Sequence, residues 1–309
     1  MDIEIEEITK ERYASFFHPQ YIYNSVDFAE LNSEKADVIH YLKLGDSKPR
    51  LGIILGEKGN MLRSPFSAPF GGFTTNGVQR IEYMDEAVKL VCQYARSKGK
   101  ELLITPPSVV YDESQMSKWI SAFSRQMKTK SIDLNYHFDL SRMDSYTDFM
   151  ERSARKNLNR SLKENLVFSK LDSSDRKDVA RAYDVIRRNR EERGFPLRMT
   201  LEQVWRTVSE VVHADFFVLE YDGTDIAAAQ VFYVADGIAQ VVYWGDIREY
   251  SSLRPMNNLT YNVFKYYHDK GLRLLDIGIS TENGVPNYGL CEFKESIGCS
   301  VTLKYVFNA

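Results

Sequence analysis

The chain has 309 residues, about twice the length of a usual single domain, so we expect two domains. With 43% apolar and 27% charged residues, its composition is that of a folded protein and excludes a disordered chain. Forty basic and forty-three acidic side chains give a net charge of −3, which argues against a protein whose whole surface grips nucleic acid.

The beginning of the chain and its cysteines indicate where the protein is located and whether it holds disulfides or a metal. The first twenty residues carry acids where a signal peptide needs a basic start, and no run of eighteen apolar residues occurs. We therefore expect a cytoplasmic protein without a membrane span. Cys92, Cys291 and Cys299 are too few for a disulfide framework and lack zinc-ligand spacing, so we expect reduced cysteines and no metal.

Hydrophobic periodicity predicts the elements of the first half of the chain. They are a strand at 2–8, short helices at 10–16 and 24–32, strands at 37–45, 49–56 and 59–65, a helix at 78–98, a strand at 101–106, a helix at 112–127 and a strand at 131–140. Residues 64–72 read SPFSAPFGG, and their prolines and glycines indicate a stiff, irregular connection. Because this loop is apolar, it either packs beneath something or faces a ligand.

The second half gives a similar series of elements. The predicted elements are a basic helix at 150–165, a strand at 165–172, helices at 174–193 and 200–212, strands at 215–221, 225–234 and 238–246, a helix at 255–269, a strand at 272–280, a helix at 286–297 and a strand at 300–307. From the strand at 165–172 onward the order matches that of the first half, β-α-α-β-β-β-α-β-α-β.

The residues repeat as well at one place. YARSKGKELLITPPS ends at Ser108 and YYHDKGLRLLDIGIS ends at Ser280, and the Lys-Gly pairs within them lie 172 positions apart. Each glycine is placed to end a helix that leads into a buried strand. We expect two homologous domains, 1–143 and 144–309, with the boundary in the segment 141–150, where the strand pattern breaks.

Three antiparallel strands, a helix, a strand, a helix and a last strand resemble the GNAT N-acyltransferase fold, and the tandem pair resembles the FemABX-like aminoacyltransferases. The segments that carry the resemblance are ERSARKNLNRSLKENLVF, ERGFPLR, VVYWGD and LCEFKESIGC, in this order. The resemblance implies an α/β fold with mixed sheets, built from two tandem GNAT-like domains related by an internal duplication. It also implies transfer of an activated acyl group to an amine.

One departure bears on the acyl donor. GNAT enzymes that use coenzyme A usually hold its pyrophosphate in a Gly-rich turn before a helix, where backbone N–H groups bind anions. Here that turn reads DIREYSSLRPMNN and has no glycine, although Arg248 and Arg254 beside the helix could hold a phosphate. The donor is therefore open between aminoacyl-tRNA and acyl-coenzyme A, and no cofactor is firmly expected.

Acyl transfer to an amine needs a positive or N–H group facing the developing oxyanion and a base for the amine's proton. In the resembling family the Lys of the Phe-Lys pair lies near the reacting ester, which implies this role for Lys294. The alternative is a lysine that only favours a helix C-terminus. Tyr243 and Asp246 end a strand that runs beside the substrates in this fold, and Asp246 or Asp276 could take the proton. Both carboxylates also suit strand ends.

Further candidates are basic or lie in the apolar loop. Arg198 matches the family's phosphate-binding arginine, but Glu202 replaces the usual aromatic four residues on, and an Arg198–Glu202 ion pair is the alternative. The segment 152–170 has six basic residues, Arg155 among them, with Ala154, Leu158 and Leu162 on the inner stripe. It suits tRNA, or is a solvated helix face. Ser64, Ser67 and Phe70 would line the acceptor pocket, unless the loop only seals the two domains.

The sequence thus predicts an N-acyltransferase that moves an acyl or aminoacyl group directly to a small-molecule or peptide amine. Charged tRNA is a possible partner, and DNA is not expected. Two rivals stay open: a catalytically silent GNAT-fold protein that binds a nucleotide-linked or peptide ligand, and a coenzyme A-dependent N-acetyltransferase.

Overall fold

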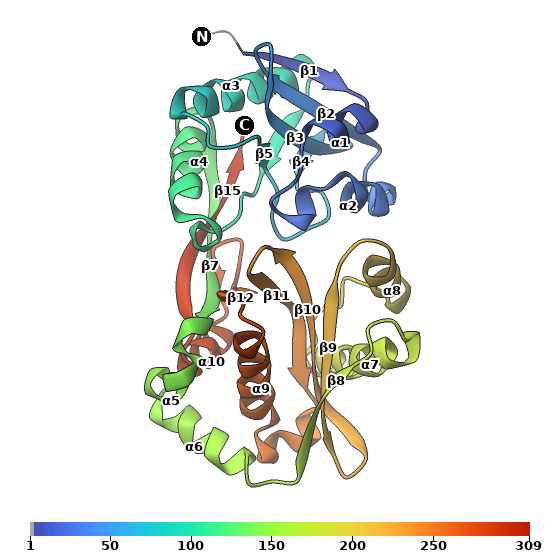
Figure 1. Ribbon diagram of the computed structural model, residues 1–309, viewed down its shortest axis with the longest axis vertical. Coiled ribbons are helices and arrows are strands. Elements are labelled where there is room, and N and C mark those ends of the chain that lie inside the picture. The colour runs from blue at the N-terminus through green and yellow to red at the C-terminus, as the bar shows by residue number, and fades with distance from the viewer. Residues whose placement is uncertain (1–2) are drawn as a thin grey trace. The chain divides into compact units, whose positions relative to one another are not determined.

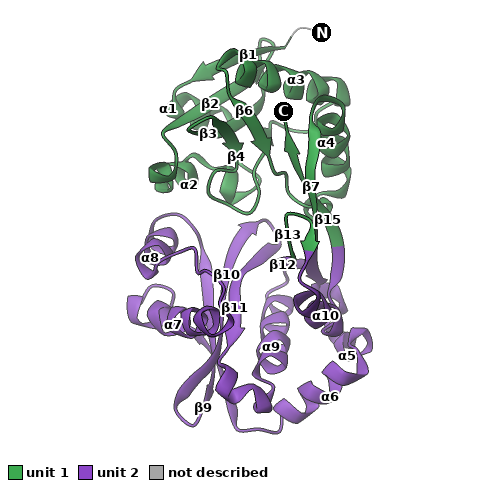
Figure 2. Cartoon of the chain, turned by 180° about the vertical axis from the view of Figure 1, so that it is seen from behind, with its two compact units in different colours: residues 1–134, 281–285, 302–309 green, residues 135–280, 286–301 purple. Residues whose placement is uncertain are grey.

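The computed structural model describes residues 3–309, so residue 2, where the first strand was expected to begin, lies outside it. The chain forms two compact units (Figure 2). Unit 1 comprises residues 1–134, 281–285 and 302–309, and unit 2 comprises residues 135–280 and 286–301. The expected division at residue 143 follows the duplicated order of elements. The units differ from it because the last strand of each half runs from one unit into the other.

The first half of the chain contains the predicted strands and helices in the predicted order (Figure 1). They are β1 (Glu4–Ile8), α1 (Lys10–Phe16), α2 (Val26–Leu31), β2 (Val38–Gly45), β3 (Pro49–Lys58), β4 (Met61–Ser64), β5 (Phe73–Thr75), α3 (Ile81–Ser97), β6 (Glu101–Ile104), α4 (Glu113–Gln126) and β7 (Lys128–Asp139). Of the strands and α-helices just named, only the short β5, which pairs with β3, was not expected.

The second half also matches its predicted order. Its elements are α5 (Tyr146–Phe149), α6 (Arg152–Ser161), β8 (Leu166–Leu171), α7 (Arg176–Arg193), α8 (Leu201–Glu210), β9 (Ala214–Tyr221), β10 (Thr224–Ala235), β11 (Ile238–Asp246), α9 (Pro255–Asp269), β12 (Leu274–Ile279), β13 (Thr281–Glu282), β14 (Val285–Pro286), α10 (Tyr288–Ser296) and β15 (Ser300–Asn308). Of these, α5, β13 and β14 were not expected. The repeated glycines behave as predicted, because Gly99 and Gly271 follow α3 and α9 with φ of 66° and 76°.

Unit 1 is a mixed sheet covered by helices. Its strand order is β1-β2-β3-β4-β6-β15, followed by the first half of β7, and β4 and β6 run parallel. The apolar faces of α3 and α4 pack on this sheet around Trp119 and Phe123. The last strand of the chain completes the unit, because Phe307 of β15 lies fully buried in this core.

Unit 2 repeats this plan with the order β8-β9-β10-β11-β12 and then the second half of β7. Two helices cover opposite faces of the sheet (Figure 1). Leu259 and Phe264 of α9 pack on Ala229 and its neighbours, whereas Gly245, which pairs with Ala228, meets α7. We call these the α9 face and the α7 face.

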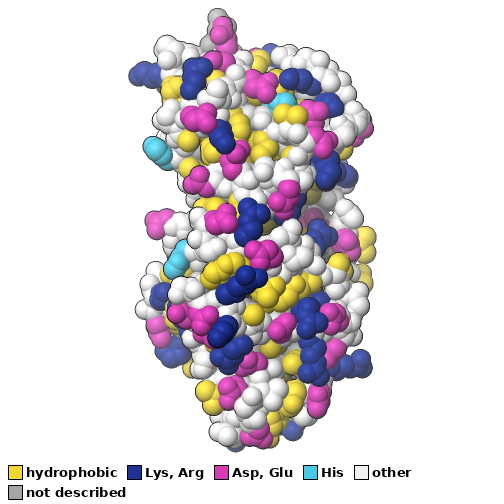
Figure 3. All heavy atoms as spheres, turned by 90° about the vertical axis from the view of Figure 1, so that its right-hand side faces the viewer, with side chains coloured by type: hydrophobic (Ala, Val, Ile, Leu, Met, Phe, Trp, Pro, Cys, Tyr) yellow, Lys and Arg dark blue, Asp and Glu magenta, His cyan; other side chains and the backbone are white. Residues whose placement is uncertain are grey.

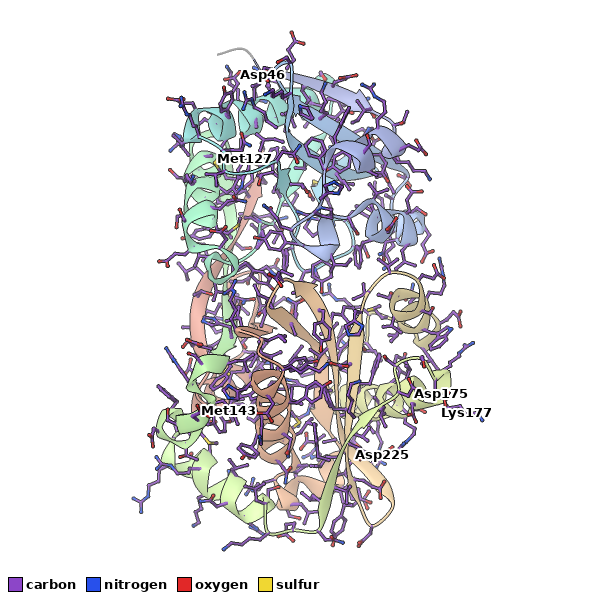
Figure 4. All side chains as sticks on the ribbon, in the orientation of Figure 1. Asp46, Met127, Met143, Asp175, Lys177 and Asp225 are labelled. Carbon is purple, nitrogen blue, oxygen red and sulfur yellow. The ribbon has the colours of Figure 1, made fainter. Side chains whose placement is uncertain are left out.

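Helix α7 is defined at both ends by its sequence. Asp175 is the N-cap, and its carboxylate accepts a hydrogen bond from the backbone N–H of Lys177 at 2.8 Å. Both residues lie at the N-terminal end of the helix (Figure 4). Gly194 ends it with φ of 69°, a conformation that glycine adopts without strain. The last turn of α7 is thereby fixed beside β11.

Candidate functional site

The candidate site lies where two parallel strands of unit 2 part. β11 pairs with β12 only between Ile238–Gln240 and Leu274–Asp276, although both strands continue further. Beyond these residues the pairing of the two strands ends. We call this place, where the strands part, the splay. The predicted Tyr243 and Asp246 belong to β11, and Asp276 belongs to β12.

Lys294, from α10, fills the β12 side of the splay. Its side chain is 2% exposed, and its amine donates hydrogen bonds to the backbone oxygens of Ile277 at 2.9 Å, Gly278 at 2.9 Å and Ile279 at 3.2 Å. Three acceptors match the three donors of an ammonium group. Burial lowers the pKa of Lys294 to about 8. Lys294 is therefore a buried cation, and three backbone oxygens of β12 hold its charge at the splay.

Asp276 anchors an irregularity in β12. Its carboxylate accepts hydrogen bonds from Asn135 Nδ2 at 2.8 Å, the Gly278 backbone N–H at 2.9 Å and Gln240 Nε2 at 2.6 Å. The register with β7 shifts between Asp276 and Gly278, where Gly278 has φ of 72°. Asp276 thus stabilises the bend that presents the carbonyls to Lys294. Its negative charge also acts against the lowering of the Lys294 pKa.

Tyr243 owes its orientation to a β-bulge. Gln230 of β10 pairs with Tyr243 and Val231 pairs with Val241, so Val242 is an extra residue. The bulge moves Tyr243 to the α7 face, where the Arg190 guanidinium lies 5.3 Å from its ring centroid. Arg190 also contributes, through its charge, to the lowered pKa of Lys294. Arg190 and Tyr243 are therefore in contact on the α7 face.

Asp246, the last residue of β11, connects the end of this strand to α7. It is buried, and its Oδ1 accepts a hydrogen bond from Arg193 Nη2 at 2.9 Å. Asn189 Nδ2 donates to its backbone oxygen at 2.6 Å. Both contacts tie the last turns of α7 to the strand that carries Tyr243.

The three predicted loop residues lie in unit 1. The Phe70 ring is 1% exposed and packs edge-on against Tyr21, Tyr23 and Tyr111. Ser64 Oγ accepts from the Gly72 backbone N–H at 2.9 Å. This packing accounts for an apolar, glycine-containing loop, because a Cβ on Gly71 would stand 2.8 Å from the Pro65 nitrogen. Because the Phe70 ring is enclosed, its predicted role in lining an acceptor pocket has no support.

A small pocket does lie beside this loop. Its volume is about 20 Å³, room for about one water molecule, and Ser64 and Ser67 are among its lining residues. Ser67 Oγ accepts a hydrogen bond from Lys35 Nζ at 2.7 Å and donates to Asn32 Oδ1 at 2.8 Å. Burial lowers the pKa of Lys35. The hydroxyls are thus held by protein partners within unit 1.

The predicted arginines outside the splay are all exposed. Arg198 lies in the connection between α7 and α8, and the expected alternative is wrong, because Glu202 pairs with Arg176 at 2.6 Å. Arg248 begins the 3-10 helix η5 (Arg248–Leu253), which occupies the place of the missing Gly-rich turn. Arg254 precedes α9 with φ of 57°.

The basic helix forms as predicted, with two corrections. Ala154 and Leu158 are buried, but Leu162 is 48% exposed because α6 ends at Ser161. Lys170 lies apart on β8 and pairs with the buried Asp215 at 3.1 Å. Five basic side chains stay exposed, and within residues 3–309 none has an ion pair. These residues, which we call the α6 basic face, are Arg152, Arg155, Lys156, Arg160 and Lys163.

Residues 150–295 match the family described as Acetyltransferase (GNAT) domain. The crystal structure of FemX superposes with a TM-score of 0.69 and 14% identity over 99% of this chain and 96% of FemX. This chain has the tandem GNAT fold of FemX. The predicted resemblance and fold class are confirmed, and the matched domain supports an N-acyltransferase.

Two further structures share the tandem GNAT fold. The C-terminal domain of a putative lysylphosphatidylglycerol synthetase from Agrobacterium fabrum has a TM-score of 0.63 and 12% identity over 97% of this chain and 90% of that one. A tandem GNAT protein from the clavulanic acid biosynthesis pathway has a TM-score of 0.53 and 12% identity over 100% and 98%. No curated protein matches the sequence.

Two further properties of the described residues concern metal binding and membrane insertion. Within residues 3–309 no three or more His, Cys, Asp or Glu side chains gather closely enough to hold a metal ion. Over the same range, none of the helices combines the length and the apolar character that crossing a bilayer requires.

Sequence reasoning missed several polar residues around the splay. Gln230, Gln240 and Asn135 are almost fully buried, and each interrupts a predicted strand of mostly apolar residues. A lone amide in an apolar strand is a usable signal, since a buried polar group needs a partner. Arg190 had no such signal, because it is one of many arginines on α7.

Proposed function

We propose that the protein transfers an activated acyl or aminoacyl group directly to an amine at the splay of unit 2. The observation that carries this proposal is the buried Lys294 amine, held where β11 and β12 part. The acceptor nitrogen attacks the acyl carbonyl, and the Lys294 charge stabilises the oxyanion that forms. The nitrogen gives its proton to Asp246 or Asp276, and the carbonyl reforms as the leaving group departs with the bonding electrons.

The two carboxylates differ in how they are held. Asp276 accepts three hydrogen bonds that fix β12, whereas Asp246 has one side-chain partner in Arg193. We therefore favour Asp246 as the proton acceptor and a positioning role for Asp276. Asp246→Asn would lower turnover without changing the fold. Asp276→Asn would lower stability, because it puts an NH2 donor where a carboxylate oxygen now accepts hydrogen bonds from N–H donors.

For the donor, we favour aminoacyl-tRNA over acyl-coenzyme A. The η5 helix replaces the Gly-rich turn, and the α6 basic face offers five unpaired cations to a phosphate backbone. Arg198, Arg248 and Arg254 are exposed and suit further phosphate contacts. The likeness to FemX and to a lysylphosphatidylglycerol synthetase domain is in keeping with this choice. The cytoplasmic location stays a prediction from the sequence.

Ligand binding tests the donor first. A ligand at 100 times its dissociation constant stabilises the folded protein by about 2.7 kcal/mol. We expect thermal stabilisation by charged tRNA and less by uncharged tRNA. Stabilisation by acetyl-coenzyme A alone would favour the N-acetyltransferase, and tight binding without acyl transfer from any donor would favour the silent binding protein.

The catalytic role of Lys294 is tested with a matched variant. Lys294→Met should lower turnover with the identified donor about 100-fold or more. Lys265→Met is the control, because Lys265 is exposed on α9 and pairs with Asp269 at 2.6 Å. Equal turnover in Lys294→Met and wild type would rule out the oxyanion role.

A further inference from the structure

Arg190 is a cation that forms no ion pair within residues 3–309. It lies in the last turn of α7 and is partly buried, and its Nε is enclosed without a hydrogen-bond acceptor within residues 3–309. Burial lowers the pKa of its guanidinium, and the nearby charge of Arg193 adds to this effect. An enclosed donor without an acceptor costs free energy. The stability of the fold therefore does not explain why an arginine occupies this position.

The other arginines along this helix are compensated. Arg181 pairs with Asp225, labelled in Figure 4, at 3.0 Å, and Arg187 pairs with Glu191 at 2.9 Å. Arg188 contacts Glu192 at 3.0 Å, and Arg193 contacts Asp246 at 2.9 Å. Basic and acidic side chains accordingly lie interspersed on the surface of unit 2 that faces the viewer in Figure 3. Each of these outer arginines thus faces a carboxylate from α7 or from the sheet, whereas Arg190 has none within residues 3–309.

A second unsatisfied donor lies on the same face of the sheet. Gln230 is 1% exposed, and its Nε2 has no acceptor within residues 3–309. Gln230 pairs directly with Tyr243 across β10 and β11, and Arg190 stacks over the Tyr243 ring. Two donors from α7 and β10 thus flank one aromatic ring on the α7 face.

We propose that Arg190, Tyr243 and Gln230 form a subsite for an oxyanion group, a carboxylate or a phosphate. Calling its occupant part of the substrate rests on the proposed acyl transfer at the splay. Guanidinium and amide N–H groups are the donors that such a group accepts, and an anion would offset the charge of Arg190. Tyr243 lies on β11, one of the two strands that part at the splay, so an anion held there is placed to orient a reacting molecule.

Binding of small anions by the full chain tests the subsite directly. The probes are inorganic pyrophosphate and succinate, each titrated by calorimetry, and the stronger probe tells a phosphate from a carboxylate subsite. Arg190→Met should weaken binding of the preferred probe about ten-fold or more. Arg187→Met is the matched control and should bind like wild type. Equal binding by Arg190→Met and wild type, or binding of neither probe by wild type, would overturn the proposal.

The stability of the unliganded variant gives an independent readout. If Arg190 serves a ligand, Arg190→Met keeps or raises the melting temperature without a probe, because an uncompensated charge is removed. If Arg190 has only a structural role, Arg190→Met will have a lower melting temperature and the same affinity for the probe. This result would contradict the proposed subsite. Gln230→Met, of similar shape and without a donor, should also weaken probe binding, and it tests the subsite if Arg190→Met does not fold.

This experiment separates the subsite from the reaction. Probe binding needs neither donor nor acceptor, so a protein that binds pyrophosphate through Arg190 but transfers no acyl group would contradict only the proposed function. If turnover requires Lys294 but anion binding does not depend on Arg190, only the proposed subsite is contradicted.

Discussion

Lys294 shows how one side chain combines packing with charge. Its methylene groups run through a buried environment and its amine ends among three carbonyl oxygens, with the Tyr136 ring centroid 5.4 Å away. The carbonyl dipoles and the aromatic face favour a cation, whereas the loss of water disfavours it. Because the pKa falls, desolvation outweighs these contacts. The residue therefore holds its charge at neutral pH at a cost to stability.

This cost makes the stability of the protein depend on pH in a predictable direction. Below pH 8 Lys294 is charged in both the folded and the unfolded state. Between its folded pKa of about 8 and the ordinary lysine value of about 10.4, the unfolded state binds more protons. The free energy of unfolding of wild type should therefore rise with pH relative to Lys294→Met, by about 3 kcal/mol at most.

Denaturant unfolding at pH 7, 8.5 and 10 checks this prediction. The quantity to compare is the difference in unfolding free energy between wild type and Lys294→Met, because other titrating groups contribute equally to both. A difference that stays constant over this range would mean that Lys294 keeps its proton in the folded state.

At the scale of elements, the sequence predicted which segments form strands and helices but not how the strands pair. Apolar periodicity is local, so the segment LRLLDIGIS reveals a buried strand by itself. The extra residue Val242 arises in the pairing of β11 with the preceding strand β10, and the irregularity after Asp276 arises in the pairing of β12 with β7, far away in the sequence. These two irregularities orient Tyr243 and the carbonyls around Lys294. The sequence thus predicted the strands that carry Tyr243 and Asp276, and strand pairing determined their geometry.

The irregularity in β12 gives a testable backbone prediction. Gly278 has φ of 72°, and an added Cβ would meet nothing within 4 Å. Gly278→Ala should therefore cost about 1–2 kcal/mol through backbone conformation alone. Gly289→Ala is the control, because Gly289 lies inside α10 with an open Cβ position and should gain up to about 1 kcal/mol. If thermal unfolding gave both variants the same stability, the strained position of Gly278 would be disproved.

At the scale of the whole molecule, the duplicated order of elements was visible in the sequence, but the membership of the last strands was not. β15 follows α10 of unit 2 along the chain, yet it pairs with β6 in unit 1. β7 ends the first half, yet its residues from Asn135 onward pair with β12 in unit 2. An alternating strand pattern specifies which face is buried, not which neighbour is taken. Each unit is therefore completed by a strand from the other half of the sequence.

The contribution of β15 to unit 1 leads to a final prediction. Phe307 is fully buried, and its ring stacks on Phe123 with centroids 5.2 Å apart. Phe307→Ala should lower the free energy of unfolding by about 3–5 kcal/mol, through lost burial and the cavity left behind. Phe195→Ala is the control, because Phe195 is 46% exposed and should change stability by about 0.5 kcal/mol or less. In hydrogen exchange, Phe307→Ala should speed exchange at the β6 amides, including that of Leu102, which donates to the backbone oxygen of Ala309 although more than two hundred residues separate them. Faster exchange confined to unit 2 would mean that the last strand stabilises the half of the chain from which it comes.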